Sequence, residues 1–293
     1  MKKLFVYLKH NPMFISAFKN WVIGKLGFYI ITGFVVFLFF RNEVNAQILD
    51  VAYVPTPDVV VERMLEMANV GPGDYVIDLG CGDGRIVIAA AKRGAFGHGV
   101  DIDPQRIKEA QENAEKSGVA DKVIFVEENI YDTDFSRANV ITMYLFPSIN
   151  IKLRPSLLEN LEPGSRIVSH DFSMDEWKAD KQHGRMEEHA IHFWIVPAQV
   201  EGTWIWKTAG KEFKMSVGQK FQMLEPGILS DSVTLKVENS LLSGKRISFT
   251  ATNPFNQKKY VYSGQVNEVE ISGIVQIHDG NSKTVENWTA VLN

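Results

Sequence analysis

The sequence predicts an α/β protein in which a Rossmann-like, doubly wound sheet is followed by a small all-β sandwich or barrel. Between about residues 56 and 171, short apolar runs alternate with helical patterns, which is typical of a parallel sheet with helices on both faces. From about Gly202 the helical patterns stop, and short alternating runs separated by turn residues follow. We expect three segments, at residues 1–46, 47–197 and 198–293.

The α/β part is expected to begin with a helix after Thr56-Pro57, with the threonine as N-cap and the proline at the first helical position. Two further helices are expected over residues 85–92 and 105–118. Apolar runs predict five strands, at residues 75–79, 98–102, 122–127, 139–145 and 166–171. Ligands of such sheets bind at the carboxyl ends of the strands, so the residues that follow the strands are the candidates for a site.

A glycine-rich turn, GCGDG at residues 80–84, follows the first strand. Its glycines allow a ligand to approach the backbone closely, and the helix N-terminus that follows can accept partial negative charge. Asp78 stands before the turn, and Asp101 ends the next strand, where a carboxylate can accept both hydroxyls of an adenosine ribose. The pattern D-x-G-x-G-x-G differs from the G-x-G-x-x-G that seats a dinucleotide pyrophosphate. Its leading carboxylate suits a cofactor with an amino group, such as S-adenosylmethionine.

The stretches VIDLGCGDGR and GVDIDP resemble the cofactor-binding sequence of class I S-adenosylmethionine-dependent methyltransferases. YVPTPDVVVERML before them, and MYLFPSINIKLRP and SHDF after them, are similar to the family of the mitochondrial protein-lysine methyltransferases that modify the c-type ring protein of ATP synthase and the adenine nucleotide translocase. The resemblance covers roughly residues 51–177, a little under half of the chain. It implies S-adenosylmethionine as cofactor and N-methylation of lysine in a protein acceptor.

The resemblance also implies roles for individual residues. Asn129 stands where the family usually has an aspartate that accepts from the adenine amino group, and its amide oxygen can still accept that bond, so we expect weaker adenine recognition. Thr56 should line the cofactor pocket, although N-capping explains it as well. Asp101 would bind the ribose. The residues that would surround the methionine moiety are Asp78, Gly80, Gly82 and Gly84.

Tyr144 is the candidate catalytic residue, because it lies at the end of the fourth strand, where the superfamily places its acceptor-facing motif. A lysine amine has a free pKa of about 10.4 and must lose a proton before it attacks. The hydroxyl and ring of Tyr144 could orient that amine, with core packing as the alternative. His170 and Asp171 are secondary candidates at the same edge. The histidines expected to be surface or packing residues, without metal-ligand geometry, are His183, His189 and His192, and no metal site is predicted.

Three residues near the turn have structural explanations. Asp83 and Asp103 each precede a predicted helix and are expected to cap it. Cys81 is the only cysteine of the chain, which excludes an internal disulfide. We expect it to be a buried thiol and not a nucleophile, because no positive partner that would lower its pKa is evident.

Residues 1–46 have the character of a signal peptide or membrane anchor. An uncharged stretch at residues 26–40 follows five lysines and precedes Arg41. This stretch is short for a spanning helix of about 20 residues, and the small residues before Gln47 suit a signal-peptidase site. An extension back to Trp21 would be long enough to span if Lys25 snorkels. Cleavage after Ala46 and anchoring both stay open, with a buried core helix as the third alternative. The lysines predict a main body outside the cytoplasm.

The charge pattern and the C-terminal segment limit the function. Residues 1–46 carry an excess of five positive charges, so the remaining chain carries −9 of the total of −4, which argues against a nucleic-acid partner. Trp204, Trp206 and Trp288 of the all-β accessory segment are expected in its core, although they could line a pocket. Two alternatives to the lysine methyltransferase stay open. One is a small-molecule methyltransferase, and the other is a non-catalytic exported binding protein, since S-adenosylmethionine is not expected to be abundant outside the cytoplasm.

Overall fold

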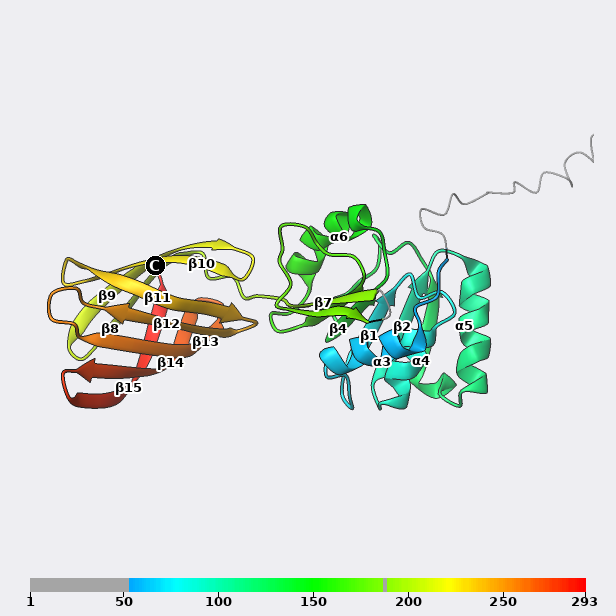
Figure 1. Cartoon of the computed structure of the whole chain (residues 1–293), viewed down its shortest axis with the longest axis horizontal. Coiled ribbons are helices and arrows are strands. Elements are labelled where there is room, and N and C mark those ends of the chain that lie inside the picture. Colours follow the sequence, from blue (N-terminus) through cyan, green and yellow to red (C-terminus); the bar gives the residue numbers. More distant parts are fainter. Residues whose placement is uncertain (1–52, 187–188) are drawn as a thin grey trace, which may run out of the picture. The chain divides into compact units, whose positions relative to one another are not determined.

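The structure is a computed structural model that describes residues 53–186 and 189–293 (Figure 1). The expected leader, residues 1–46, lies outside the described residues. Within them, no helix combines the length and the apolar character that crossing a membrane requires. An α/β sheet is followed by a closed β-barrel, so the predicted fold class is confirmed.

A seven-stranded sheet forms the α/β part, in the order β3-β2-β1-β4-β5-β7-β6. Strands β1 to β5 run parallel to their neighbours, and β7 and β6 follow in antiparallel pairings. Because β1 lies between β2 and β4, the strand order reverses next to the glycine-rich turn, which is where such sheets bind ligands. The strands are β1 (Tyr75–Leu79), β2 (Phe96–Asp101), β3 (Val123–Glu127), β4 (Val140–Met143), β5 (Arg166–His170), β6 (Lys181–Met186) and β7 (His189–Ile195).

Helices cover both faces of the sheet, as predicted. Alternate residues of a strand point to opposite faces. Val76 of β1 accordingly packs in a cluster with residues of α3, whereas its neighbour Ile77 packs in a cluster with residues of α6. The helices are α3 (Asp58–Met67), α4 (Arg85–Lys92), α5 (Pro104–Lys116), the 3-10 turn η1 (Ala120–Lys122) and α6 (Pro147–Asn160).

The antiparallel hairpin β6–β7 is the main difference from the expected parallel sheet. The sequence of β6, KQHGRM, is polar, so it shows no apolar run. β7 pairs with β5, and this pairing sets His170 opposite Ile191 and Ser169 opposite His192. The hairpin therefore brings the start of β7 to the carboxyl end of β5.

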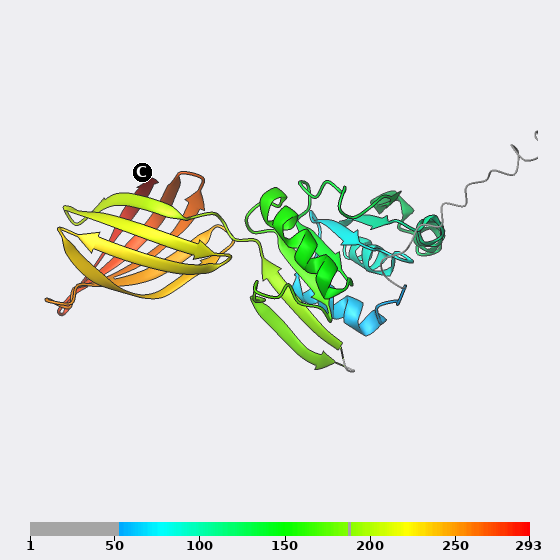
Figure 2. The ribbon, with the colours of Figure 1, turned by 90° about the horizontal axis from the view of Figure 1, so that it is seen from above.

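The C-terminal part is a closed barrel of eight antiparallel strands, visible in Figure 2. Trp204, Trp206 and Trp288 are 0%, 3% and 2% exposed, which confirms the prediction that they pack in the core. Trp206 lies edge to face with Tyr262 and Trp288, at ring-centroid distances of 5.4 and 5.5 Å. The strands are β8 (Gly202–Thr208), β9 (Lys211–Lys220), β10 (Met223–Ser230), β11 (Val233–Ser243), β12 (Arg246–Thr252), β13 (Lys259–Asn267), β14 (Glu270–Asp279) and β15 (Ser282–Leu292).

Candidate active site

The glycine-rich turn connects β1 to α4 and has little room for side chains. Gly80, Gly82 and Gly84 all have positive φ angles. A Cβ on Gly82 would lie 2.4 Å from the ring of Tyr53, and a Cβ on Gly84 would lie 2.8 Å from the ring of Phe125. Glycine is therefore required at these two positions both by backbone conformation and by space. The exposed backbone N–H groups of such a turn suit a closely approaching ligand.

Asp78 lies inside the sheet just before this turn and is only 2% exposed. Its Oδ1 accepts a hydrogen bond of 2.7 Å from the hydroxyl of Thr142, on the adjacent strand β4. Burial raises the pKa of the Asp78 carboxyl to about 7, and the negative charges of Asp101 and Asp83 raise it further against the Thr142 bond. A cationic ligand group at this position would restore the ionised form.

Asp101 ends β2 and faces the glycine-rich turn. Its Oδ2 accepts from the backbone N–H of Gly82 at 2.9 Å, and its Oδ1 accepts from the backbone N–H of Asp103 at 3.0 Å. Each carboxylate oxygen keeps a second lone pair. The two backbone bonds thus fix the carboxylate in an orientation that can accept two hydroxyls at once, as the ribose assignment requires.

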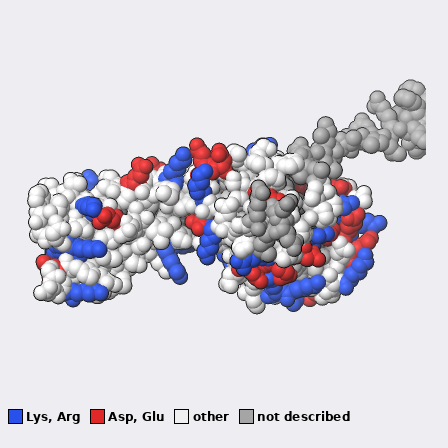
Figure 3. Space-filling model, viewed as in Figure 1, with Lys and Arg blue, Asp and Glu red and all other residues white. Residues whose placement is uncertain are grey.

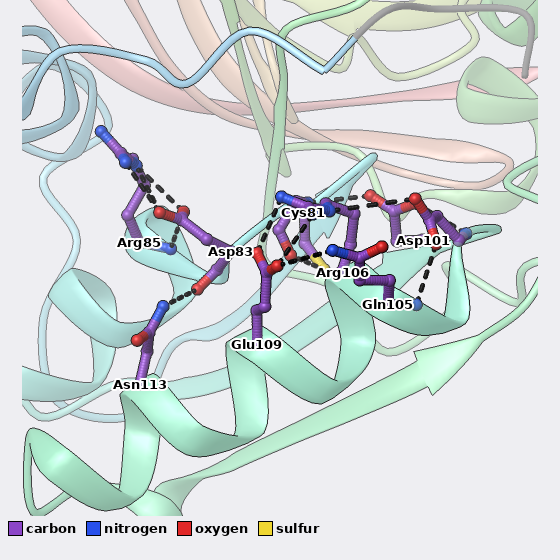
Figure 4. A network of polar contacts seen from close by, with 10 residues as sticks. Cys81, Asp83, Arg85, Asp101, Gln105, Arg106, Glu109 and Asn113 are labelled. Atoms are coloured by element: carbon purple, nitrogen blue, oxygen red, sulfur yellow. Dashed lines mark hydrogen bonds and ion pairs between the residues drawn. The ribbon is translucent and has the colours of Figure 1, made fainter.

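Charged side chains support the turn from the helix side, as Figure 4 shows. Arg85, at the start of α4, forms a two-pronged contact with Asp83, with distances of 2.9 and 2.7 Å, and donates to the backbone oxygen of Thr56 at 2.8 Å. Burial opposes it, but the Arg85 guanidinium holds the pKa of the Asp83 carboxyl below its usual value. Asn113 of α5 donates to the backbone oxygen of Asp83 at 3.0 Å. These contacts hold the turn between α4 and α5.

The expectations for the neighbouring structural residues are met. Asp103 is the N-cap of α5, and its side chain accepts from the backbone N–H of Gln105 at 2.8 Å. Asp83 accepts from the backbone N–H of Arg85, although the N-cap of α4 itself is Gly84. Cys81 is 5% exposed, and burial, together with the nearby carboxylates, raises the pKa of its thiol. Its thiolate is therefore disfavoured.

Asn129 follows β3 and is exposed. Its side-chain oxygen accepts from the backbone N–H of Tyr131 at 3.1 Å, so it shapes the loop after the strand. Backbone pairing at the end of β3, where Glu128 donates to Asp101, sets this loop beside the end of β2. Asn129 is thus placed along the same strand edge as Asp101, as the adenine assignment requires, and its role there stays a prediction.

A second group of side chains lies at the ends of β4, β5 and β7. Tyr144 follows β4 and is half-buried, and its ring lies over that of His170 at a centroid distance of 3.8 Å. Its hydroxyl donates to Oδ2 of Asp171 at 3.3 Å. The same oxygen lies 3.0 Å from Nδ1 of His189. The candidates Tyr144, His170 and Asp171 are therefore brought together, as expected.

Two sequence expectations at this edge are wrong. Thr56 is not the N-cap of α3, because the helix begins at Asp58 with Pro57 as its N-cap. The Thr56 hydroxyl instead lies 3.1 Å from Nδ1 of His170 and is 4% exposed. His189 was expected to lack metal-ligand geometry, but it shares a cluster with His170 and Asp171 in which the ligand atoms lie within 4.8 Å of one another.

Electrostatics make this edge a neutral imidazole beside a carboxylate. Burial lowers the pKa of His170 to about 4, despite the opposing charge of Asp171. Burial also opposes ionisation of Asp171, but bonds from His189 and from the backbone N–H of Ala190 hold the pKa of that carboxyl below its usual value. The pKa of the Tyr144 phenol is raised by burial and by the Asp171 charge, so the phenol keeps its proton at neutral pH.

These two groups fit the two ends of the methyl-transfer reaction. The buried, unusually basic carboxylate of Asp78 suits the cofactor amino group, and the fixed carboxylate of Asp101 suits the ribose. The sequence reasoning missed Tyr53, whose ring covers Gly82 and lies 4.6 Å from the guanidinium of Arg106. Tyr53 opens the stretch YVPTP, but a ring packed on a turn 29 residues later leaves no signal in local spacing.

Comparisons with known proteins concern this α/β part. The sequence profile of the ANTKMT methyltransferase domain matches residues 78–181. The chain is 43% identical over 152 residues to a protein-lysine N-methyltransferase of Saccharolobus islandicus, a match that covers 50% of this chain and 94% of that protein. It is 29% identical over 132 residues to the human lysine N-methyltransferase that is named for the c-type ring protein of ATP synthase, and this match covers 45% of this chain and 56% of that protein.

A solved structure is also similar to this chain. It is an RNA methyltransferase from Salinibacter ruber in complex with S-adenosyl-L-homocysteine, 49% identical, with a TM-score of 0.49, and the match covers 50% of this chain and 96% of that one.

Proposed function

The chain belongs to the ANTKMT methyltransferase family, and from this premise we propose that it methylates lysine side chains of a protein acceptor. S-adenosylmethionine is its methyl donor. The observation that carries the lysine assignment is the match over 94% of the length of the Saccharolobus islandicus protein-lysine N-methyltransferase. The animal relatives are matched over little more than half of their length, so their acceptor is not transferred to this chain.

At the donor end, Asp78 and Asp101 are proposed to hold the cofactor by its amino group and its ribose. When bound, the cofactor supplies a methyl group on a positively charged sulfur, which leaves without acid catalysis. The glycines of the turn let the backbone come close, and Tyr53 covers Gly82 from the other side. The protein therefore contributes position and exclusion of water more than proton transfer.

At the acceptor end, Tyr144 is proposed to orient the lysine amine. The phenol keeps its proton and points it at Asp171, so the oxygen has lone pairs free to accept an N–H of the amine. The ring offers a face for a cation before the amine loses its proton. The neutral amine then forms the new N–C bond while the S–C bond breaks, and S-adenosylhomocysteine leaves.

The test is transfer of labelled methyl from S-adenosylmethionine to proteins of a membrane and envelope extract, followed by acid hydrolysis. We expect the label in methyl-lysine. Label in other amino acids would overturn the lysine assignment and leave a protein methyltransferase. Label only in small molecules would favour a small-molecule methyltransferase, and cofactor binding without any transfer would favour a binding protein.

We further propose that residues 1–46 direct the chain to a membrane and that the remaining chain lies outside the cytoplasm. The support is the excess of lysines before the apolar stretch at residues 26–40. This topology needs a supply of cofactor outside the cytoplasm, which makes it the part of the proposal most open to a direct test.

A further inference from the structure

A cluster of three side chains with converging lone pairs lies at the carboxyl end of β5. His170 ends β5, Asp171 follows it, and His189 begins β7. Nε2 of His170 lies 2.9 Å from Nδ1 of His189, which lies 3.0 Å from Oδ2 of Asp171. The third side of the triangle, from Nε2 of His170 to Oδ2 of Asp171, is 3.4 Å.

These atoms have too few protons to satisfy one another. The carboxylate can only accept, so its contact with His189 requires a proton on Nδ1 of that ring. That nitrogen then has no lone pair to offer His170, whose Nε2 must therefore present a lone pair of its own. The proton of the neutral His170 ring then resides on Nδ1, beside the Thr56 hydroxyl. Three lone-pair atoms thus converge on one shared proton.

From this geometry we propose that His170, Asp171 and His189 bind a divalent transition-metal ion, for which zinc fits the donors best. Zinc takes imidazole nitrogens at about 2.0–2.1 Å and carboxylate oxygens at about 2.0–2.2 Å, which sets tetrahedral ligand atoms about 3.3–3.5 Å apart. The observed separations of 2.9, 3.0 and 3.4 Å are close to that spacing. Three protein ligands leave a fourth position for water or another ligand.

Neighbouring groups orient these ligands as the surroundings of metal sites do. The Thr56 hydroxyl beside Nδ1 of His170 leaves Nε2 free for the metal. The backbone N–H of Ala190 donates to Oδ1 of Asp171 at 2.8 Å and leaves Oδ2 free. The His170 side chain is fully buried, whereas that of His189 is 28% exposed, so the cluster has a buried base and an open side for entry of the ion.

The test uses the purified full-length chain, stripped with a chelator and titrated with CoCl2 and, separately, with ZnCl2. We expect one Co²⁺ per chain at this site, with the visible absorption bands of tetrahedral Co²⁺, and displacement of those bands by Zn²⁺. His189→Gln should weaken binding by about 100-fold or more, since even changes behind the ligands cost about 10–100-fold. His183→Gln, on the same hairpin, is the matched control and should bind as the wild type does.

Thermal unfolding gives a second measurement that needs no activity. Zn²⁺ should raise the melting temperature of the wild type and of His183→Gln, but not of His189→Gln or Asp171→Asn. If His189→Gln bound Co²⁺ like the wild type, the metal would lie elsewhere in the chain. If the wild type bound no metal, the cluster would be a proton-sharing network only. Either result would overturn the proposal. This inference does not rest on the lysine assignment, and neither titration depends on methyl transfer.

Discussion

Asp78 shows at the scale of one residue how the site departs from what stability alone would select. Its carboxyl is almost fully buried among strands and accepts from the Thr142 hydroxyl. Burial raises its pKa to about 7, far above the unfolded value of about 3.9. The folded chain without cofactor therefore binds a proton more tightly than the unfolded chain does. A cofactor amino group would supply the missing positive charge.

The first prediction concerns the stability of the cofactor-free chain. Because the folded pKa of Asp78 lies above the unfolded one, its contribution is fully present below about pH 4 and is lost as pH rises to about 7, by at most roughly 4 kcal/mol. Asp78→Asn removes this loss and can still accept from Thr142. We expect its urea midpoint at pH 8 to exceed that of the wild type.

The exposed Asp58→Asn is the matched control, since that side chain is 95% exposed. It should leave the pH dependence between 4 and 7 unchanged. Asp78→Asn should also lose most of the stabilisation that S-adenosylmethionine gives the wild type. A lower midpoint for Asp78→Asn at pH 8, with the pH dependence retained, would show that the carboxylate is stabilising and not strained.

The second prediction separates the two parts of the Tyr144 side chain. Tyr144→Phe keeps the ring over His170 and removes the hydroxyl that donates to Asp171. If the hydroxyl orients the amine, the Phe variant should already lose most of its turnover at unchanged cofactor affinity. If only the ring matters, the Phe variant should stay active and Tyr144→Ala should fail. Full activity in both variants would make Tyr144 a packing residue.

The turn between β1 and α4 is the element on which the donor site depends. Its glycines adopt left-handed conformations, and the space beside them is taken by Tyr53 and Phe125. Gly84 is also the residue before the first turn of α4, where a ligand would meet the helix N-terminus. Conformation and packing therefore demand the same residue type at the same position.

The third prediction tests that demand. Gly84 has φ of +79°, and an added Cβ would lie 2.8 Å from Phe125 and 2.9 Å from Ala110. The left-handed conformation costs about 1–2 kcal/mol, and overpacking costs about 1–3 kcal/mol. Gly84→Ala should therefore lower the free energy of unfolding by about 2–5 kcal/mol in a urea titration. Gly71→Ala is the control, since nothing lies within 4 Å of its added Cβ. Equal stability of the two variants would contradict the packing argument.

Elements with a clear local pattern were predictable from the sequence. The strand at Tyr75–Leu79 and the helix at Arg85–Lys92 have the predicted bounds, because an apolar run bounded by turns and a helical apolar face are local signals. The hairpin β6–β7 was not predictable in the same way. Its first strand is polar, and its place is fixed by pairing with β5, which is a tertiary contact.

The site divides along the same line. The turn and Asp101 were predictable, because one strand and its loop carry them. His189 was not, because its contact with Asp171 depends on the β5–β7 pairing. Thr56 was assigned to a cap from the local pattern, but the structure places its hydroxyl beside His170, 114 residues away. Local sequence predicts which groups are available, and the fold decides which of them meet.

For the whole molecule, charge and targeting set the partners. Figure 3 shows Lys, Arg, Asp and Glu side chains intermingled on the visible face of the described chain. Residues 47–293 carry −9 in total, since the whole chain carries −4 and residues 1–46 carry an excess of five positive charges. This distribution favours a protein acceptor over a nucleic acid.

The fourth prediction concerns topology. Alkaline phosphatase and a fluorescent protein that matures only in the cytoplasm are fused separately after Asn293. The lysines before residues 26–40 predict phosphatase activity and no fluorescence. The opposite pattern would place the α/β part and barrel in the cytoplasm and would remove the difficulty of cofactor supply.

The central claim is that donor and acceptor are held by separate groups along one strand edge. The most direct measurement is the single-turnover rate of methyl transfer against S-adenosylmethionine concentration, for the wild type, Asp101→Ala and Tyr144→Ala. Asp101→Ala should raise the half-saturating concentration about 30-fold, or about 2 kcal/mol, and largely keep the plateau rate. Tyr144→Ala should lower the plateau at unchanged half-saturation. Wild-type half-saturation in Asp101→Ala, or the same parameter changing in both variants, would contradict the two-part site.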